Sequence, residues 1–155
     1  MYILYLAFCK IPDLGTIFTL RNIANCVCKS DINSLSVVQY AIEGLGIKEI
    51  AVVGHTNCGG IEASLDIDAL DGPIKDWLLP INKLYLDNKD EMDKLSCRKE
   101  KLDNLCKLNI RRVVGIIDEL DFINKARSNG DIIKIKGWIY DIGSGGLHDL
   151  GITTH

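Results

Sequence analysis

A histidine and a cysteine three residues apart are the side chains of this sequence best suited to chemistry. His55 and Cys58 lie in the segment Gly54–Gly60, which reads GHTNCGG. Imidazole nitrogen and thiolate sulfur together are ligands typical of zinc rather than of magnesium or calcium. Gly59 and Gly60 let the backbone turn closely around the cysteine and enter a helix, whose N-terminus favours the thiolate. Two ligands do not hold zinc on their own, so a buried cysteine beside a hydrogen-bonded histidine is the alternative.

Other chemistries fit this segment less well. Its glycine spacing hints at a phosphate-binding loop, but the Lys-Ser/Thr pair that such a loop needs is replaced by Gly60 and Ile61. The chain also has no Gly-x-Ser-x-Gly motif of the kind that presents a serine nucleophile. A metal site therefore remains the chemistry that the segment favours.

The remaining cysteines carry weaker signals. Cys26 and Cys28 form a C-x-C pair with no second pair at zinc-finger spacing, and a thiol redox module rests on this pair alone. Cys97 and Cys106 lie in charged segments with helical patterns, where we expect an exposed thiol and a packing residue. Cys9 ends an apolar run, where it is either a core residue or a metal ligand.

The elements that must position His55 and Cys58 follow from the hydrophobic pattern. Residues 50–53 form a β-branched run bounded by glycine, which is typical of a buried parallel strand. Thr16–Leu20 is predicted to be a second strand, and a helix is predicted from an N-cap at Ser34 to the glycines at 44 and 46. Together they would form a right-handed crossover unit. Open α/β sheets place their sites at the carboxyl ends of such strands, where residues 54–60 would lie.

The rest of the chain reads as helices followed by a hairpin. The pattern predicts a short helix through residue 65 and helices over 77–88, 91–108 and 118–127, with a buried segment over 110–117. It also predicts strands over 131–141 and 147–152, joined by a glycine turn. The predicted fold class is α/β, with an open, mainly parallel sheet flanked by helices and a C-terminal antiparallel hairpin. We expect residues 1–155 to form a single domain.

Charge and composition exclude several classes of partner. A net charge of −3 gives no basic excess for nucleic acid or an anionic membrane. The apolar run Tyr2–Phe8, rich in Ile, Leu and aromatic residues, is predicted to be a strand buried on both faces. It lacks the basic region of a signal peptide, and it is far shorter than the about 20 residues that span a bilayer. We therefore expect a cytoplasmic protein, with organellar targeting left open if the N-terminus is incomplete.

Four segments, in order, resemble the motifs of the β-class carbonic anhydrases. They are the RN-x-A-N segment at 21–25, the helix at 38–42, the strand and GH-x-x-CGG motif at 50–60, and the G-W-x-Y-D hairpin at 137–141 with the following glycine turn and Leu147. The resemblance covers about residues 15–153. The resemblance and the position at the carboxyl end of a strand both point to residues 54–60 as the site. The resemblance also implies a β-carbonic anhydrase-like fold.

The resemblance implies that His55 and Cys58 are zinc ligands. In that family a cysteine in a C-x-D-x-R motif completes the metal site, and the Asp and Arg of that motif orient the zinc-bound water. No such motif precedes Arg21, so Cys9 is the candidate third ligand and the domain is expected to be incomplete at its N-terminus.

The implied activity is the reversible hydration of carbon dioxide to bicarbonate and a proton by zinc-bound hydroxide, since zinc lowers the pKa of its bound water to about 7. The residues expected to support the ligands or line the pocket are Asn22, Asn25, Tyr40, Gly59 and Gly60. A homodimer or higher homo-oligomer is also implied. The alternative is a catalytically impaired homologue that acts as a non-enzymatic oligomer partner or a bicarbonate-binding domain, which the missing Asp and Arg favour.

Overall fold

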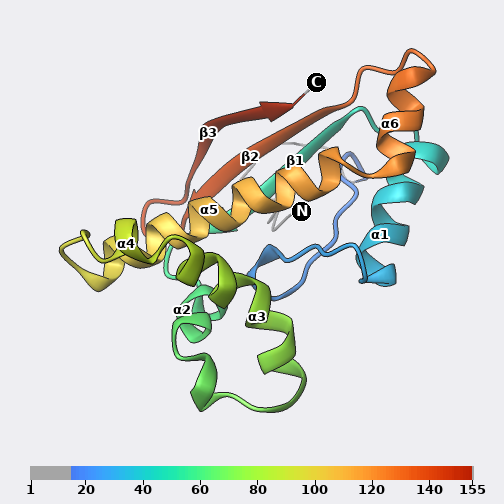
Figure 1. Cartoon of the computed structure of the whole chain (residues 1–155). Helices are drawn as coiled ribbons and strands as arrows, with labels where there is room; N and C mark the ends of the chain where they lie inside the picture. The colour runs from blue at the N-terminus through green and yellow to red at the C-terminus, as the bar shows by residue number, and fades with distance from the viewer. Residues whose placement is uncertain (1–14, 155) are drawn as a thin grey trace.

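The computed structural model describes residues 15–154, which form an α/β fold (Figure 1). Cys9 and the run Tyr2–Phe8 lie outside the described residues. In chain order the elements are η1 (Ile23–Asn25), α1 (Ile32–Gln39), the π-helical turn η2 (Tyr40–Gly44), β1 (Glu49–His55), α2 (Gly59–Leu65), η3 (Ile67–Ala69), α3 (Gly72–Asp87), α4 (Lys89–Met92), α5 (Arg98–Asp118), α6 (Asp121–Ser128), β2 (Lys134–Asp141) and β3 (Gly146–Thr154).

The described strands form a three-stranded mixed sheet in the order β1-β2-β3. β1 pairs with β2 in parallel, with Ile50 opposite Ile135 and His55 opposite Tyr140. β2 pairs with β3 antiparallel across a tight turn, as the alternating pattern and the glycines at 143–146 predict. The α/β class, the buried strand before the GHTNCGG segment and the C-terminal hairpin are thus confirmed.

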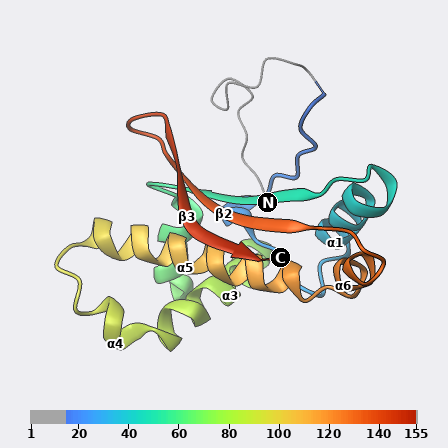
Figure 2. The same ribbon diagram turned by 90° about the horizontal axis from the view of Figure 1, so that it is seen from above.

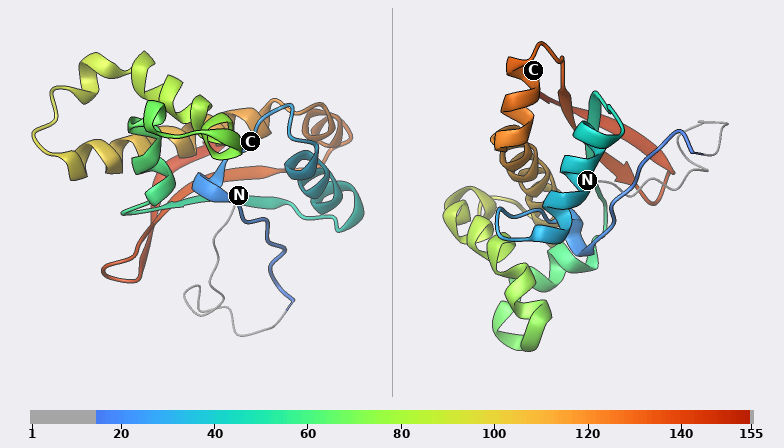
Figure 3. Two further views of the ribbon diagram at one scale, coloured as in Figure 1. Left: turned by 90° about the horizontal axis from the view of Figure 1, so that it is seen from below. Right: turned by 90° about the vertical axis from the view of Figure 1, so that its right-hand side faces the viewer.

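Helix α5 covers one face of all three strands (Figure 2). Its apolar residues recur at helical spacing and are buried, among them Cys106, Ile110 and Ile117. The helix approaches β1 so closely that a Cβ added at Gly54 would lie 2.7 Å from Cys106 Sγ and 2.9 Å from Ile110 Cδ1. Glycine at this strand position is therefore required by packing. Seen from below, α3 and α5 lie in front of the sheet (Figure 3).

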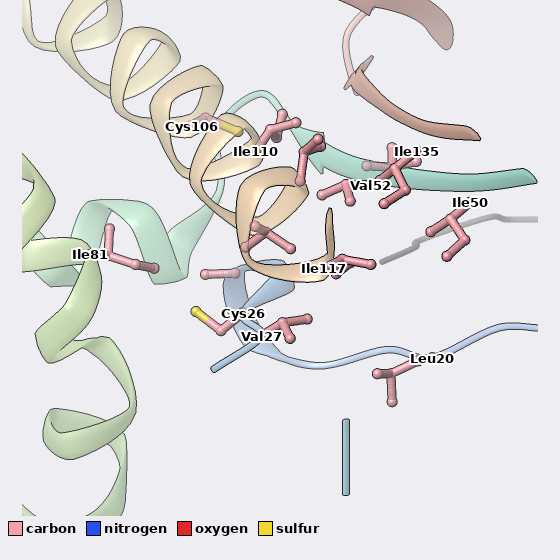
Figure 4. Close-up of a cluster of buried hydrophobic side chains, with 14 of the residues drawn as sticks. Leu20, Cys26, Val27, Ile50, Val52, Ile81, Cys106, Ile110, Ile117 and Ile135 are labelled. Carbon is pink, nitrogen blue, oxygen red and sulfur yellow. The ribbon is translucent and has the colours of Figure 1, made fainter. Parts of the chain in front are cut away.

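The core joins the sheet, α5 and the segment that precedes α1. Figure 4 shows Val52 and Ile135 of the strands, Ile110 of α5, and Leu20 and Val27 of the N-terminal segment in one cluster. Burying each such side chain contributes on the order of 1.5–3 kcal/mol. The core therefore fixes where residues 20–27 lie relative to β1. Within residues 15–154 no helix combines the length and the apolar character that a membrane crossing needs.

Two expectations about the first βα region are wrong. Thr16–Leu20 is not a strand, because it forms no ladder with any described strand, so the expected crossover from it does not form. The helix begins at Ile32 rather than after Ser34, since the carboxylate of Asp31 accepts a hydrogen bond from the backbone N–H of Asn33. The Ser34 hydroxyl instead donates to the same carboxylate and is buried.

Helix boundaries in the middle of the chain also differ from the pattern. The predicted helix at 77–88 begins earlier, at Gly72, where Pro73 suits the first turn. The predicted helix at 91–108 divides at residues 93–97, and its second half continues through the apolar stretch 110–117 as α5. The predicted end of the last helix near residue 129 is confirmed, with Gly130 at φ +95°.

Candidate metal centre

The carboxyl end of β1 brings together the two predicted metal ligands. His55 is the last residue of β1 and is half-buried, and Cys58 is buried at the N-cap of α2. Asn57 makes the turn between them with φ 54°, a left-handed conformation that asparagine tolerates. His55 Nδ1 lies 2.9 Å from the backbone oxygen of Thr56. A carbonyl can only accept, so Nδ1 donates to it, and Nε2 is the ring nitrogen left to face Cys58 or a metal.

His55 and Cys58 are also hydrogen-bonded to one another, and this bond shifts the pKa of both side chains. The bond to Cys58 raises the pKa of His55, against burial and the positive charge of Arg21, which both lower it. Burial alone would raise the pKa of Cys58, but the bond from His55 and the backbone N–H groups of Ile61 and Gly60 outweigh it, so the pKa is lowered. The pair is therefore biased towards thiolate, the form that binds metals.

The RN-x-A-N segment forms the opposite wall of the site. Ala24 and Asn25 both have positive φ, at 56° and 43°, which turns the chain back towards α2. Two helices hold this conformation: Trp77 Nε1 of α3 donates to the oxygen of Ile23 at 2.9 Å, and Asn109 Nδ2 of α5 donates to the oxygen of Ala24 at 2.8 Å. A strained backbone persists only when its surroundings fix it, and these two donors do so.

Close approach of the two walls requires glycine at position 60. A Cβ there would lie 2.8 Å from Ile23 Cγ2 and 3.0 Å from Ala24 Cβ, closer than van der Waals contact. A Cβ at Gly59 would meet nothing within 4 Å. Glycine at position 60 thus permits close approach of the RN-x-A-N segment, whereas Gly59 faces open space.

Between the walls lies a cavity of about 400 Å³. It is lined by Arg21, Asn22, Ile23, Ala24, Asn25, His55, Cys58, Gly59 and Gly60. The structure therefore brings together every predicted pocket residue that it describes, with one exception. Tyr40 does not line this cavity: its ring lies against Phe18, with centroids 6.1 Å apart, and it is 57% exposed.

The two asparagines of the RN-x-A-N segment differ in their contacts. Asn22 Nδ2 donates to the oxygen of Cys26 at 2.7 Å, which ties the segment to the following turn. Asn22 Oδ1 and Asn25 Nδ2 are buried and have no hydrogen-bond partner within residues 15–154. An acceptor and a donor near the cavity wall are thus available to a polar ligand or water.

The other described cysteines do not join the pair. Cys26 and Cys106 are buried, and burial raises their pKa to about 11 and about 12. Cys28 is half-buried and Cys97 is exposed. Over the described range 15–154, no three metal-ligating side chains come together. The described site therefore offers two protein ligands.

Three residues of this site were not singled out in the sequence. Arg21 lines the cavity, and its place in the RN-x-A-N motif was the available signal. The backbone oxygen of Thr56 accepts from His55, and the hydroxyl of Thr56 donates to Asp141. The Y-D end of the hairpin motif had indicated only a strand.

Comparison with known proteins gives a consistent set of relatives. The family model described as carbonic anhydrase matches residues 10–147. A carbonic anhydrase of Emericella nidulans is 33% identical over 140 residues, covering 90% of this chain and 61% of the relative, and one of Candida albicans is 35% identical over 139 residues, covering 89% and 49%. The chain thus spans about half to three-fifths of the length of these two curated relatives.

Solved structures show the same likeness. One of two tetrameric β-carbonic anhydrases of Sordaria macrospora superposes with a TM-score of 0.86 at 31% identity, covering 92% of this chain and 72% of the other. A β-carbonic anhydrase of Aspergillus fumigatus gives 0.83 at 33% identity, covering 89% and 65%. A Coccomyxa β-carbonic anhydrase in complex with acetazolamide gives 0.85 at 26% identity, covering 91% and 64%.

Proposed function

Because the chain belongs to the carbonic anhydrase family, we propose that it is a zinc-dependent enzyme that interconverts carbon dioxide and bicarbonate. The observation that carries the proposal is the His55–Cys58 pair at the wall of the cavity. Its donors suit zinc: an imidazole whose Nε2 is available, and a thiol whose pKa is lowered. When bound, zinc supplies the Lewis-acid chemistry that makes water a nucleophile near neutral pH.

We propose Cys9 as the third protein ligand. β1 pairs with β2 on one edge only, and no described strand lies along its other edge. Beside β1 lies an apolar groove of about 330 Å³, lined among others by Leu20, Val38 and Ile50. Cys9 lies outside the described residues, so the proposal rests on the family resemblance, which calls for a cysteine ligand besides His55 and Cys58.

The chain's own residues account for binding of the substrate pair. Arg21 contributes positive charge beside His55, which suits the bicarbonate anion. Asn25 Nδ2 is a buried donor and Asn22 Oδ1 a buried acceptor, both in residues that line the cavity. These groups would orient bicarbonate without a proton transfer of their own.

We further propose that the protein is cytoplasmic and assembles with copies of itself. The solved relatives from Sordaria macrospora are described as tetrameric. Light scattering coupled to gel filtration would give the mass of the particle, and a monomer at micromolar concentration would contradict this part of the proposal.

The test combines metal content with stopped-flow hydration of carbon dioxide. We expect one zinc per chain in the wild type, loss of zinc and activity in Cys58→Ser and Cys9→Ser, and retention of both in Cys97→Ser, which removes an exposed thiol as a matched control. Retained zinc in Cys9→Ser would contradict only the proposal that Cys9 is the third ligand.

A zinc-free and inactive wild type would overturn the enzyme proposal. It would favour the alternative of a non-enzymatic oligomer partner or bicarbonate-binding domain. Calorimetric titration with bicarbonate would then separate a binding domain from an oligomer partner.

A further inference from the structure

We infer that Thr56 and Asp141 are positioning residues that hold the imidazole of His55 in the tautomer able to bind a metal through Nε2. The inference rests on the proposed function, since it concerns the same site. It begins with the bond from His55 Nδ1–H to the backbone oxygen of Thr56, at 2.9 Å. The direction of the Thr56 carbonyl therefore sets the orientation of the His55 ring. The groups that hold Thr56 lie in the β2–β3 hairpin.

Thr56 is held to the hairpin at three points. Its backbone N–H donates to the oxygen of Tyr140 at 2.9 Å, which continues the pairing of β1 with β2 by one residue. Its hydroxyl donates to Asp141 Oδ1 at 3.2 Å and accepts from the backbone N–H of Ile142 at 3.1 Å. The hydroxyl of Thr56 thus acts as both donor and acceptor. Together with the backbone bond, it restricts the orientation of Thr56 and the direction of its carbonyl.

The carboxylate of Asp141 is itself held rigidly. Oδ1 also accepts from the backbone N–H of Gly143 at 2.9 Å, and Oδ2 accepts from the hydroxyl of Ser144 at 2.8 Å. Bonds to a charged acceptor are stronger than neutral ones, so this turn is a firm anchor. A connected path therefore runs from the hairpin turn through Asp141 and Thr56 to Nδ1 of His55.

The path has a chemical consequence for the ring. Free neutral imidazole exchanges its proton between the two nitrogens, and only the form protonated on Nδ1 offers Nε2 as a ligand. Groups that accept from a ligating histidine typically change metal affinity about 10- to 100-fold when they are lost. Here the acceptor is a backbone oxygen that no substitution removes, so the side chains that aim it carry the effect.

The test uses Thr56→Val, which keeps the shape but loses the hydroxyl, and Thr56→Ser, which restores it. Asp141→Ala removes the anchor, and Asp149→Ala is the matched control, because Asp149 makes a similar bond to the backbone N–H of Gly151 at 2.8 Å in the same hairpin. Two readouts apply: the ring nitrogen NMR shifts of His55 in metal-free protein, and the affinity and absorption spectrum for Co²⁺ alone.

For Thr56→Val and Asp141→Ala we expect a detectable population that has lost the proton on Nδ1, and a Co²⁺ affinity lowered about 10-fold or more. Thr56→Ser and Asp149→Ala should match the wild type in both. Wild-type tautomer and affinity in Thr56→Val and Asp141→Ala would overturn the inference. If the wild type binds no metal, the proposed function fails, while the NMR shifts of the metal-free proteins still decide the positioning role.

Discussion

Substituting Gly60 tests whether contact between the two walls shapes the cavity. In Gly60→Ala the new methyl group would lie 2.8 Å from Ile23 Cγ2, about 0.7 Å inside the shortest comfortable carbon contact. The RN-x-A-N wall cannot retreat freely, because Trp77 and Asn109 hold the backbone oxygens of residues 23 and 24. Overpacking of this kind costs about 1–3 kcal/mol.

Gly59→Ala provides the matched comparison. Both glycines lie in the first turn of α2, so both variants receive the same gain in helix propensity, up to about 1 kcal/mol. Only position 60 meets a neighbour, since a Cβ at Gly59 finds nothing within 4 Å. The difference in the free energy of unfolding between the two variants therefore isolates the overpacking, and Gly60→Ala should be less stable by about 1–3 kcal/mol.

Urea denaturation of the metal-free proteins, followed by tryptophan fluorescence, measures this difference. With a slope of about 1–3 kcal/mol per molar urea, the midpoint of Gly60→Ala should lie about 1 M below that of Gly59→Ala, with equal slopes. Equal midpoints would refute the claim that the RN-x-A-N segment and α2 are in rigid contact. A changed slope would show that the variant alters more than this contact.

Three further predictions concern neighbouring groups. Asn109→Leu should lower the free energy of unfolding by about 1–3 kcal/mol, because it leaves the buried oxygen of Ala24 without its donor; urea denaturation measures this. The pKa of Asp141 is lowered by Ser144 Oγ and the N–H of Gly143, so its contribution to stability is present above pH about 4 and is lost as the pH falls through the folded value; the stability difference between wild type and Asp141→Asn should shrink below pH 4 in denaturation series. Iodoacetamide at pH 8 should modify the exposed Cys97 in the folded protein but not Cys26 or Cys106, which are buried and whose pKa values are raised to about 11 and about 12; mass spectrometry of the peptides checks this, and modification of all three at one rate would contradict the described burial.

The parts of the fold that could be predicted have their cause in nearby residues. Residues 50–53 are β-branched and end at a glycine, and the hairpin alternates over eleven residues around a glycine turn, so each pattern carries its own structure. His55 and Cys58 could be predicted as a pair because a short turn keeps them together wherever it lies. The motif resemblance then placed the RN-x-A-N segment at the same site, and in the structure this segment lines the same cavity as His55 and Cys58.

The parts that could not be predicted depend on partners distant in sequence. Thr16–Leu20 has the composition of a strand, but a strand needs a neighbour with which to form a ladder, and composition does not supply one. Asp31 rather than Ser34 caps α1, since both are good capping residues and the backbone decides between them. The path from Asp141 to His55 joins residues 86 positions apart, which no periodicity reveals.

Protein contacts surround the pair of His55 and Cys58. The two walls meet at Gly60, Asn109 of α5 holds the backbone of Ala24, and the hairpin holds Thr56. Small zinc domains differ, because their folding free energy comes from the metal. Removal of metal with a chelator should therefore leave the far-ultraviolet circular dichroism unchanged, while zinc at 100 times its dissociation constant should add about 2.7 kcal/mol to stability. Unfolding upon chelation would show instead that the metal, rather than these contacts, holds β1 and α2 together.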